Sequence, residues 1–130
     1  MKRVRPVLFF LFLTFFFASC ANGGEIITCR VSVYGINGAV VLEETEMSCK
    51  AGDTALDVLK NATRGEKIHM EFSGTGAAAY VKGIDNIYEF DMGPDSGWIY
   101  YVNGEKPGVG CGSYNVGEGD SIRWEYITEE

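Results

Sequence analysis

The sequence predicts an α+β domain in which one helix packs on a mixed β-sheet. Two strand patterns joined by an Asn-Gly turn come first, one amphipathic helix pattern follows, and several further strand patterns complete the chain. Aromatic residues gather near the C-terminal end, because both tryptophans and four of the seven tyrosines lie in residues 97–126. We therefore expect the C-terminal strands to supply much of the core.

The first two strands are expected at residues 26–34 and 40–47. Apolar and polar residues alternate along the first segment, which is the period-2 pattern of a half-buried strand. Asn37-Gly38 lies between the segments and supplies residues that tolerate the positive φ of a tight hairpin turn. This pattern predicts an antiparallel hairpin.

One helix is expected to begin after residue 52. Asp53 or Thr54 can accept hydrogen bonds from the first-turn amides, and Asp57 suits the positive N-terminus of a helix. One face of this helix is apolar and is expected to pack on the sheet. That face consists of Ala55, Leu56, Val58, Leu59 and Ala62.

Further extended segments are expected at residues 67–72, 80–81, 84–90, 98–102 and 120–126. In the central segment, Trp98, Tyr100 and Val102 point to one side and Ile99 and Tyr101 to the other. Both faces are apolar, and one helix cannot cover both. Either residues 84–91 cover the second face or that face stays open as an aromatic surface; we favour partial coverage, with an open edge near Tyr80 and Tyr114.

The N-terminal segment has the layout of an export signal. A basic start precedes an apolar run at residues 7–17, and Ala18-Ser19-Cys20 resembles a bacterial lipobox, in which the cysteine is lipidated. We expect a lipoprotein-type signal peptide at residues 1–19, a tether at 20–25 and a single domain at 26–130. The expected location is extracytoplasmic, anchored by lipid to a bacterial membrane; cleavage after Ala21 is the alternative and would give a secreted protein.

The charge of the exported chain restricts its partners. Removal of the leader leaves eight basic residues against 18 acidic ones. This balance argues against electrostatic binding of nucleic acid or of anionic lipid headgroups.

Three cysteines remain once Cys20 is set aside. Cys29, Cys49 and Cys111 allow one disulfide in any of three pairings, and Cys29 and Cys49 are nearest along the chain. No Cys-x-x-Cys pair is present, so the sequence supports neither a zinc knuckle nor a thioredoxin-type redox motif.

No set of residues with catalytic spacing stands out, and we expect the protein not to be an enzyme. The single histidine, His69, is expected to face solvent from a strand. The glycine-rich residues 74–79 follow a strand but lead into no helix, which a dinucleotide site requires. The carboxylates at positions 85, 89, 91 and 95 lack calcium-loop spacing, and a solvated acidic surface is favoured over a metal site.

Several motifs resemble a bacterial family of small exported domains. They are Tyr80-Val-Lys-Gly-Ile-Asp-Asn-Ile-Tyr-Glu-Phe-Asp91, Gly97-Trp-Ile-Tyr-Tyr-Val-Asn-Gly104 and Gly117-Glu-Gly-Asp-Ser-Ile-Arg-Trp-Glu-Tyr126. That family is itself similar to the C-terminal domain of transcobalamin and intrinsic factor. The resemblance implies a β-grasp-like fold.

The same resemblance implies a ligand and a set of contacts. In the animal carriers this domain is one of two that close over cobalamin, so cobalamin is the candidate ligand here. The contacts come from regions that match residues 98–101 and 110–114. The ligand-binding residues implied in this chain are Trp98, Tyr100, Tyr101, Gly112 and Tyr114.

Three functions remain open at this stage. The first is an envelope lipoprotein that binds a corrinoid or another small ligand. The second is a structural or adhesive surface domain that binds an envelope protein, and the third is a metal-binding domain.

The lipobox pattern yields a direct prediction about Cys20. Replacing Cys20 by Ala removes the acceptor of the lipid, so the variant is expected to leave the membrane fraction or to remain unprocessed. Cell fractionation followed by immunoblotting measures this. Unchanged membrane attachment of Cys20→Ala would contradict the lipid anchor.

Overall fold

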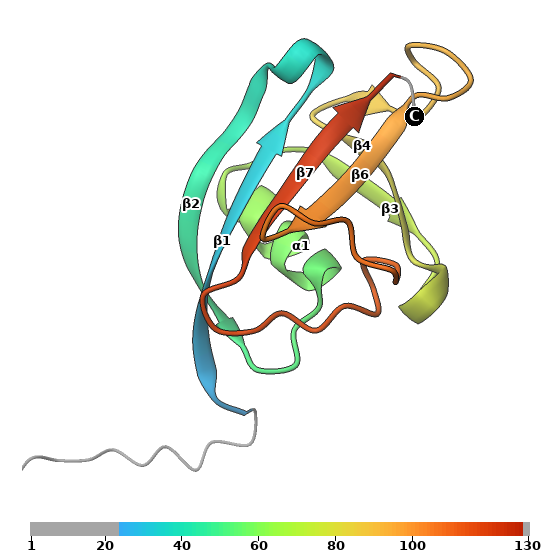
Figure 1. Ribbon diagram of the computed structural model, residues 1–130. Helices are drawn as coiled ribbons and strands as arrows, with labels where there is room; N and C mark the ends of the chain where they lie inside the picture. The colour runs from blue at the N-terminus through green and yellow to red at the C-terminus, as the bar shows by residue number, and fades with distance from the viewer. Residues whose placement is uncertain (1–23, 129–130) are drawn as a thin grey trace, which may run out of the picture.

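Between residues 24 and 128, this computed structural model contains seven strands and one α-helix (Figure 1). The elements are β1 (Ile26–Tyr34), β2 (Val40–Lys50), α1 (Ala55–Gly65), β3 (Met70–Ser73), β4 (Tyr80–Ile84), β5 (Ile87–Tyr88), β6 (Gly97–Val102) and β7 (Ser121–Ile127). The expected signal peptide and Cys20 lie outside these described residues. Within them, no helix has the length and apolar character needed to cross a membrane.

The main sheet has the strand order β2-β1-β7-β6. Strand β1 is antiparallel to β2 and parallel to β7, while β6 is antiparallel to β7. Helix α1 lies across one face of this sheet (Figure 1). The predicted α+β class, a mixed sheet with a single packed helix, is confirmed.

Local sequence explains where α1 begins. The Thr54 side chain accepts a hydrogen bond from the Asp57 N–H at 3.2 Å, and the Asp57 carboxylate accepts one from the Thr54 N–H at 3.0 Å. This reciprocal pair is a capping box, which satisfies two first-turn amides and stops the helix from extending backwards. The apolar face predicted for the helix is buried against the sheet.

Strands β3, β4 and β5 form a second, three-stranded sheet, which the sequence did not predict. Its β5 strand lies over the same face of the main sheet as the helix. The Trp98 indole N–H donates to the Ile87 carbonyl at 2.8 Å, and the Tyr126 hydroxyl donates to the Tyr88 carbonyl at 2.8 Å. Of the two alternatives, coverage of the opposite face by residues 84–91 is therefore wrong. That face stays partly open, with Tyr101 half-buried on it.

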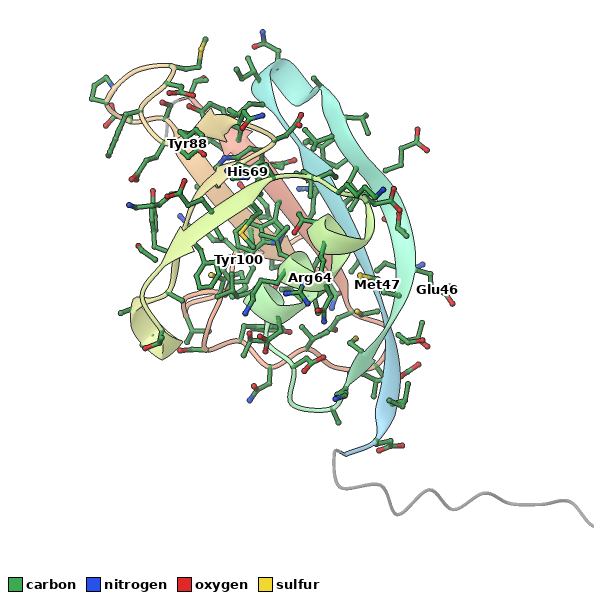
Figure 2. All side chains as sticks on the ribbon, turned by 180° about the vertical axis from the view of Figure 1, so that it is seen from behind. Glu46, Met47, Arg64, His69, Tyr88 and Tyr100 are labelled. Atoms are coloured by element: carbon green, nitrogen blue, oxygen red, sulfur yellow. The ribbon has the colours of Figure 1, made fainter. Side chains whose placement is uncertain are left out.

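The third strand begins three residues later than predicted, at Met70. Lys67 has a φ of 56°, a left-handed conformation that a strand cannot contain. His69 consequently precedes the strand, although it is exposed as expected. Its Nε2 is hydrogen-bonded with the Tyr88 hydroxyl at 3.0 Å, and both side chains are labelled in Figure 2.

The core position of Trp124 yields a stability prediction. Its side chain is 2% exposed and stacks on Tyr100 with ring centroids 5.3 Å apart. Trp124→Ala removes this buried ring and is expected to lower the free energy of unfolding by about 3–5 kcal/mol. Urea denaturation measures the loss, and Tyr101→Ala on the half-buried face is the control that should cost clearly less. Equal losses in the two variants would place Trp124 outside the core.

Candidate functional site

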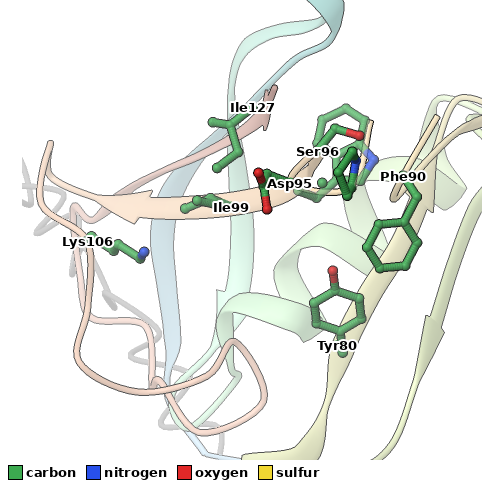
Figure 3. Close-up of a pocket in the computed structure, with 10 residues that line it drawn as sticks. Tyr80, Phe90, Asp95, Ser96, Ile99, Lys106 and Ile127 are labelled. Carbon is green, nitrogen blue, oxygen red and sulfur yellow. The ribbon is translucent and has the colours of Figure 1, made fainter. Parts of the chain in front are cut away.

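The candidate site is a groove along the outer edge of β6. Strand β6 ends the main sheet on that side, and β4 lies across the opening from it. Two hollows of about 340 and 180 Å³ share Tyr80, Trp98, Ile99 and Lys106 as lining residues, so they form one continuous groove. Figure 3 shows the Tyr80 and Phe90 rings at one end of the wider hollow and Lys106 at the other.

Backbone groups of β6 face this groove. The Val102 N–H and carbonyl bond with Glu105 on the side away from β7, whereas the Asn103 N–H donates to the Ser121 carbonyl of the β7 side. Bonding direction alternates along an antiparallel strand, so the N–H and C=O groups of Trp98 and Tyr100 point away from β7, like those of Val102. Within residues 24–128, no loop backbone group bonds to those of Trp98 or Tyr100. Backbone donors and acceptors without a loop partner therefore lie along the floor of the groove.

Phe90 stands at the rim of the groove in an unusual conformation. Its side chain is 62% exposed, and its φ is 69°, in the left-handed region that bulky residues rarely adopt. The backbone is held there because the Phe90 N–H donates to the Ser96 carbonyl and the Gly93 N–H donates to the Phe90 carbonyl. An exposed aromatic ring on a strained but fixed backbone is a feature of ligand-contacting loops.

Tyr80 lies at the same end of the rim as Phe90 and is 42% exposed (Figure 3). A Cβ atom placed on Gly97 would lie 3.4 Å from the Tyr80 hydroxyl, an ordinary contact distance, so the hydroxyl lies against β6. Partial burial, with a contribution from the neighbouring Glu89 carboxylate, raises the pKa of Tyr80 to about 12. Tyr80 is therefore a neutral hydrogen-bonding group at physiological pH.

The groove also carries one charge of each sign. Asp95 and Lys106 both line the wider hollow, and both are exposed. Within the described part of the chain neither forms an ion pair. The pair gives the groove a mixed polar character in addition to its aromatic rim.

The five ligand-binding residues implied by the resemblance lie in different places, and only two of them line the groove. Trp98 and Tyr100 line the groove, but their side chains are buried and form its floor. The Tyr100 hydroxyl donates to the Val109 carbonyl, which ties the loop after β6 to the core. Both side chains therefore belong to the core rather than to the exposed rim of the groove.

Tyr101 lies on the other face of the sheet, away from the groove. The Arg123 guanidinium sits 5.0 Å above its ring, and the Arg123 Nε lies 3.0 Å from a Glu125 carboxylate oxygen. Its half-buried ring belongs to an open outer face.

Gly112 and Tyr114 lie just outside the groove. A Cβ atom on Gly112 would come within 2.4 Å of the Gly76 carbonyl oxygen, so this position requires glycine for close packing of two loops. Tyr114 packs edge-on against Tyr100 with centroids 6.5 Å apart, and its hydroxyl donates to Asp120 at 3.2 Å. Both residues support the wall of the groove.

Sequence reasoning missed Phe90, Lys106 and Val109. All three lie in segments without strand alternation, where nothing in the pattern tells an exposed apolar residue from a buried one. Tyr80 was expected near an open edge, and the structure places it there. An exposed Phe next to a Gly-Pro turn is the one signal that could have suggested a binding loop.

Residues 24–128 hold no group of three or more histidine, cysteine, aspartate or glutamate side chains able to hold a metal ion. The Asp91 carboxylate accepts a hydrogen bond from the Tyr88 N–H at 2.8 Å, so it shapes the turn after β5.

The fold and the groove together define a small α+β domain with a ligand-sized site at the edge of its main sheet. Residues 52–128 match the family described as "Domain of unknown function (DUF4430)". The match covers more than half of the chain, so the protein belongs to this family. No curated protein sequence matches it.

Two solved structures are similar in fold. Haptocorrin in complex with Cbi superposes with a TM-score of 0.65 and 20% identity, over 85% of this chain and 27% of the haptocorrin chain. A structure described as "a putative metal binding protein from Ruminococcus gnavus ATCC 29149" superposes with a TM-score of 0.54 and 13% identity, over 78% of this chain and 96% of the other. The chain thus corresponds to about a quarter of haptocorrin, and the predicted likeness to the cobalamin carriers is confirmed at the level of fold.

The buried Tyr100 phenol yields a pH prediction. Burial raises its pKa from 10.0 to about 12. Because the folded pKa lies above the unfolded one, the stability gained from the neutral phenol is complete below pH 10 and is lost as the pH rises towards 12.

Tyrosinate absorbance during alkaline titration tests this. Tyr100→Phe should lose one tyrosine from the population that ionises near pH 12 and leave the population near pH 10 unchanged. Superimposable titration curves above pH 11 would show that the phenol is not protected.

Proposed function

We propose that this chain is a non-enzymatic, extracytoplasmic binding module, anchored to a membrane through Cys20, whose groove along β6 binds a corrinoid. The observation that carries the proposal is the open edge of β6, which places free backbone groups of Trp98 and Tyr100 beneath an aromatic rim. The common fold with haptocorrin, which was solved with Cbi, supports the choice of ligand.

The chemistry of the groove suits a corrinoid. A corrinoid has a broad apolar ring with carboxamide groups at its edge, and carboxamides both donate and accept hydrogen bonds. The β6 backbone groups can pair with the carboxamides, while Phe90 and Tyr80 cover the apolar part. Burying aromatic area on a rigid rim costs little conformational entropy, since the Phe90 backbone is already fixed.

The direction of the strands suits a membrane-anchored binder. Strands β1 and β7 are parallel, so the start of β1 and the end of β7 lie at opposite ends of the main sheet (Figure 1). Gly97 pairs with Ile127, which places the Phe90 end of the groove beside the end of β7. A lipid at Cys20 would precede the start of β1, which lies at the end of the sheet opposite the Phe90 end of the groove.

Cobalamin titration of the purified chain tests the ligand. Trp98 lines the groove, so bound cobalamin is expected to quench tryptophan fluorescence saturably at micromolar concentrations. Tyr80→Ala and Phe90→Ala are each expected to weaken binding by about tenfold, as truncation of an anchoring aromatic does.

Tyr101→Ala is the matched control, because it removes the same kind of ring from the opposite face, and its affinity should stay within about twofold. Absence of a saturable signal in the wild type would reject a corrinoid. Weakened binding in Tyr101→Ala alone would move the cobalamin site to the outer face of the sheet.

A further inference from the structure

Cys29 and Cys49 meet beneath the first hairpin. Cys29 pairs in register with Met47, and Ile27 pairs with Cys49, so the two cysteines occupy diagonal positions on one face of adjacent antiparallel strands. Their sulfur atoms are 2.8 Å apart. Both side chains are buried, with exposed fractions of 0% and 4%.

The third cysteine of the domain lies elsewhere. Cys111 lines the groove, and its thiol donates a long hydrogen bond of 3.8 Å to the Ala79 carbonyl. Of the three pairings open from the sequence, the geometry of residues 24–128 brings together the sulfurs of one. We propose that Cys29 and Cys49 form a disulfide that fastens strand β2 to β1.

The bond forms by two thiol–disulfide exchanges. The Cys49 thiolate attacks a disulfide oxidant such as oxidised glutathione, forming a mixed disulfide and releasing one thiolate. The Cys29 thiolate then attacks the Cys49 sulfur and releases the second thiolate. In total, two cysteine thiols are oxidised to one disulfide and the oxidant disulfide is reduced to two thiols.

The folded structure determines when this reaction can occur. Burial, followed by the neighbouring Cys49 thiol, raises the pKa of Cys29 to about 12, so little thiolate exists once the hairpin has closed. We expect the bond to form while the chain folds and then to resist reduction. The final step needs the sulfurs to approach to about 2.05 Å.

Strand β2 is the element that gains most from such a bond. It is an outer strand of the main sheet and pairs with β1 alone. The cysteines are 20 residues apart, so the bond would close a loop and reduce the freedom of the unfolded chain. Fraying of a long outer strand exposes an unpaired edge, which is a site for aggregation.

Peptide mapping of the full chain tests the proposal without reference to the ligand. The chain is reduced in denaturant, refolded in a mixture of oxidised and reduced glutathione, quenched in acid, alkylated and digested with trypsin. Cleavage after Arg30 and Lys50 places Cys29 and Cys49 on separate peptides. We expect those two peptides to be joined and Cys111 to be alkylated.

Two variants identify the partners. Cys111→Ala should keep the joined peptides, and Cys29→Ala should lose them. Cys20 shares a tryptic peptide with Cys29, so a bond from Cys20 to Cys49 would keep the peptides joined in Cys29→Ala. Loss of the joined peptides in that variant therefore excludes Cys20 as the partner. Reduction of the wild type should lower its melting temperature by on the order of 10 °C and leave that of Cys29→Ala unchanged. Full alkylation of all three domain cysteines, or joined peptides in Cys29→Ala, would overturn the proposal.

Discussion

The structure depends on aromatic pairs that cross from β6 to β7. Trp98 meets Tyr126 edge-on and Tyr100 stacks on Trp124, each with centroids 5.3 Å apart. Such pairs contribute about 0.5–1.5 kcal/mol beyond the area they bury. Their polar atoms have a further effect, because the indole of Trp98 and the hydroxyl of Tyr126 bond to carbonyls of β5, while Tyr100 bonds to the loop after β6. These four rings, the aromatic ladder, therefore hold the second sheet and the loop after β6 against the main sheet.

This arrangement divides the aromatic residues by function. The rings most conspicuous in the sequence are buried and serve in packing. The exposed rings at the groove come from the start of β4 and from the loop before β6, where Tyr80 and Phe90 lie. Mutations of the aromatic ladder should therefore affect mainly stability, and mutations of the rim mainly binding. The two effects could not be separated if the same residues served both purposes.

The sequence predicted those strands and helices whose bounds depend on neighbouring residues. Alternation and the Asn37-Gly38 turn gave β1 with its correct bounds, and Thr54 with Asp57 gave the start of α1. The second sheet was missed because β5 is two residues long and is held by bonds from Trp98 and Tyr126, which are distant in sequence. Of the groove, the sequence indicated only the open edge near Tyr80. The exposed position of Phe90 was missed because its left-handed backbone depends on a hydrogen bond to Ser96, which no residue pattern encodes.

The free edge of β6 also limits the kind of ligand that the proposed site would take. A sheet edge would normally invite an extended peptide, which adds as a further strand. Here the bonds between Val102 and Glu105 close the edge at one end, and the loop from Phe90 to Ser96 closes the other. Lys106 lies along the opening, and a lysine there discourages pairing with another strand. Only the backbone groups of Trp98 and Tyr100 lack a backbone partner along this edge. Two residues make too short a ladder for a peptide strand, whereas the carboxamide groups of the proposed ligand need only a few such partners.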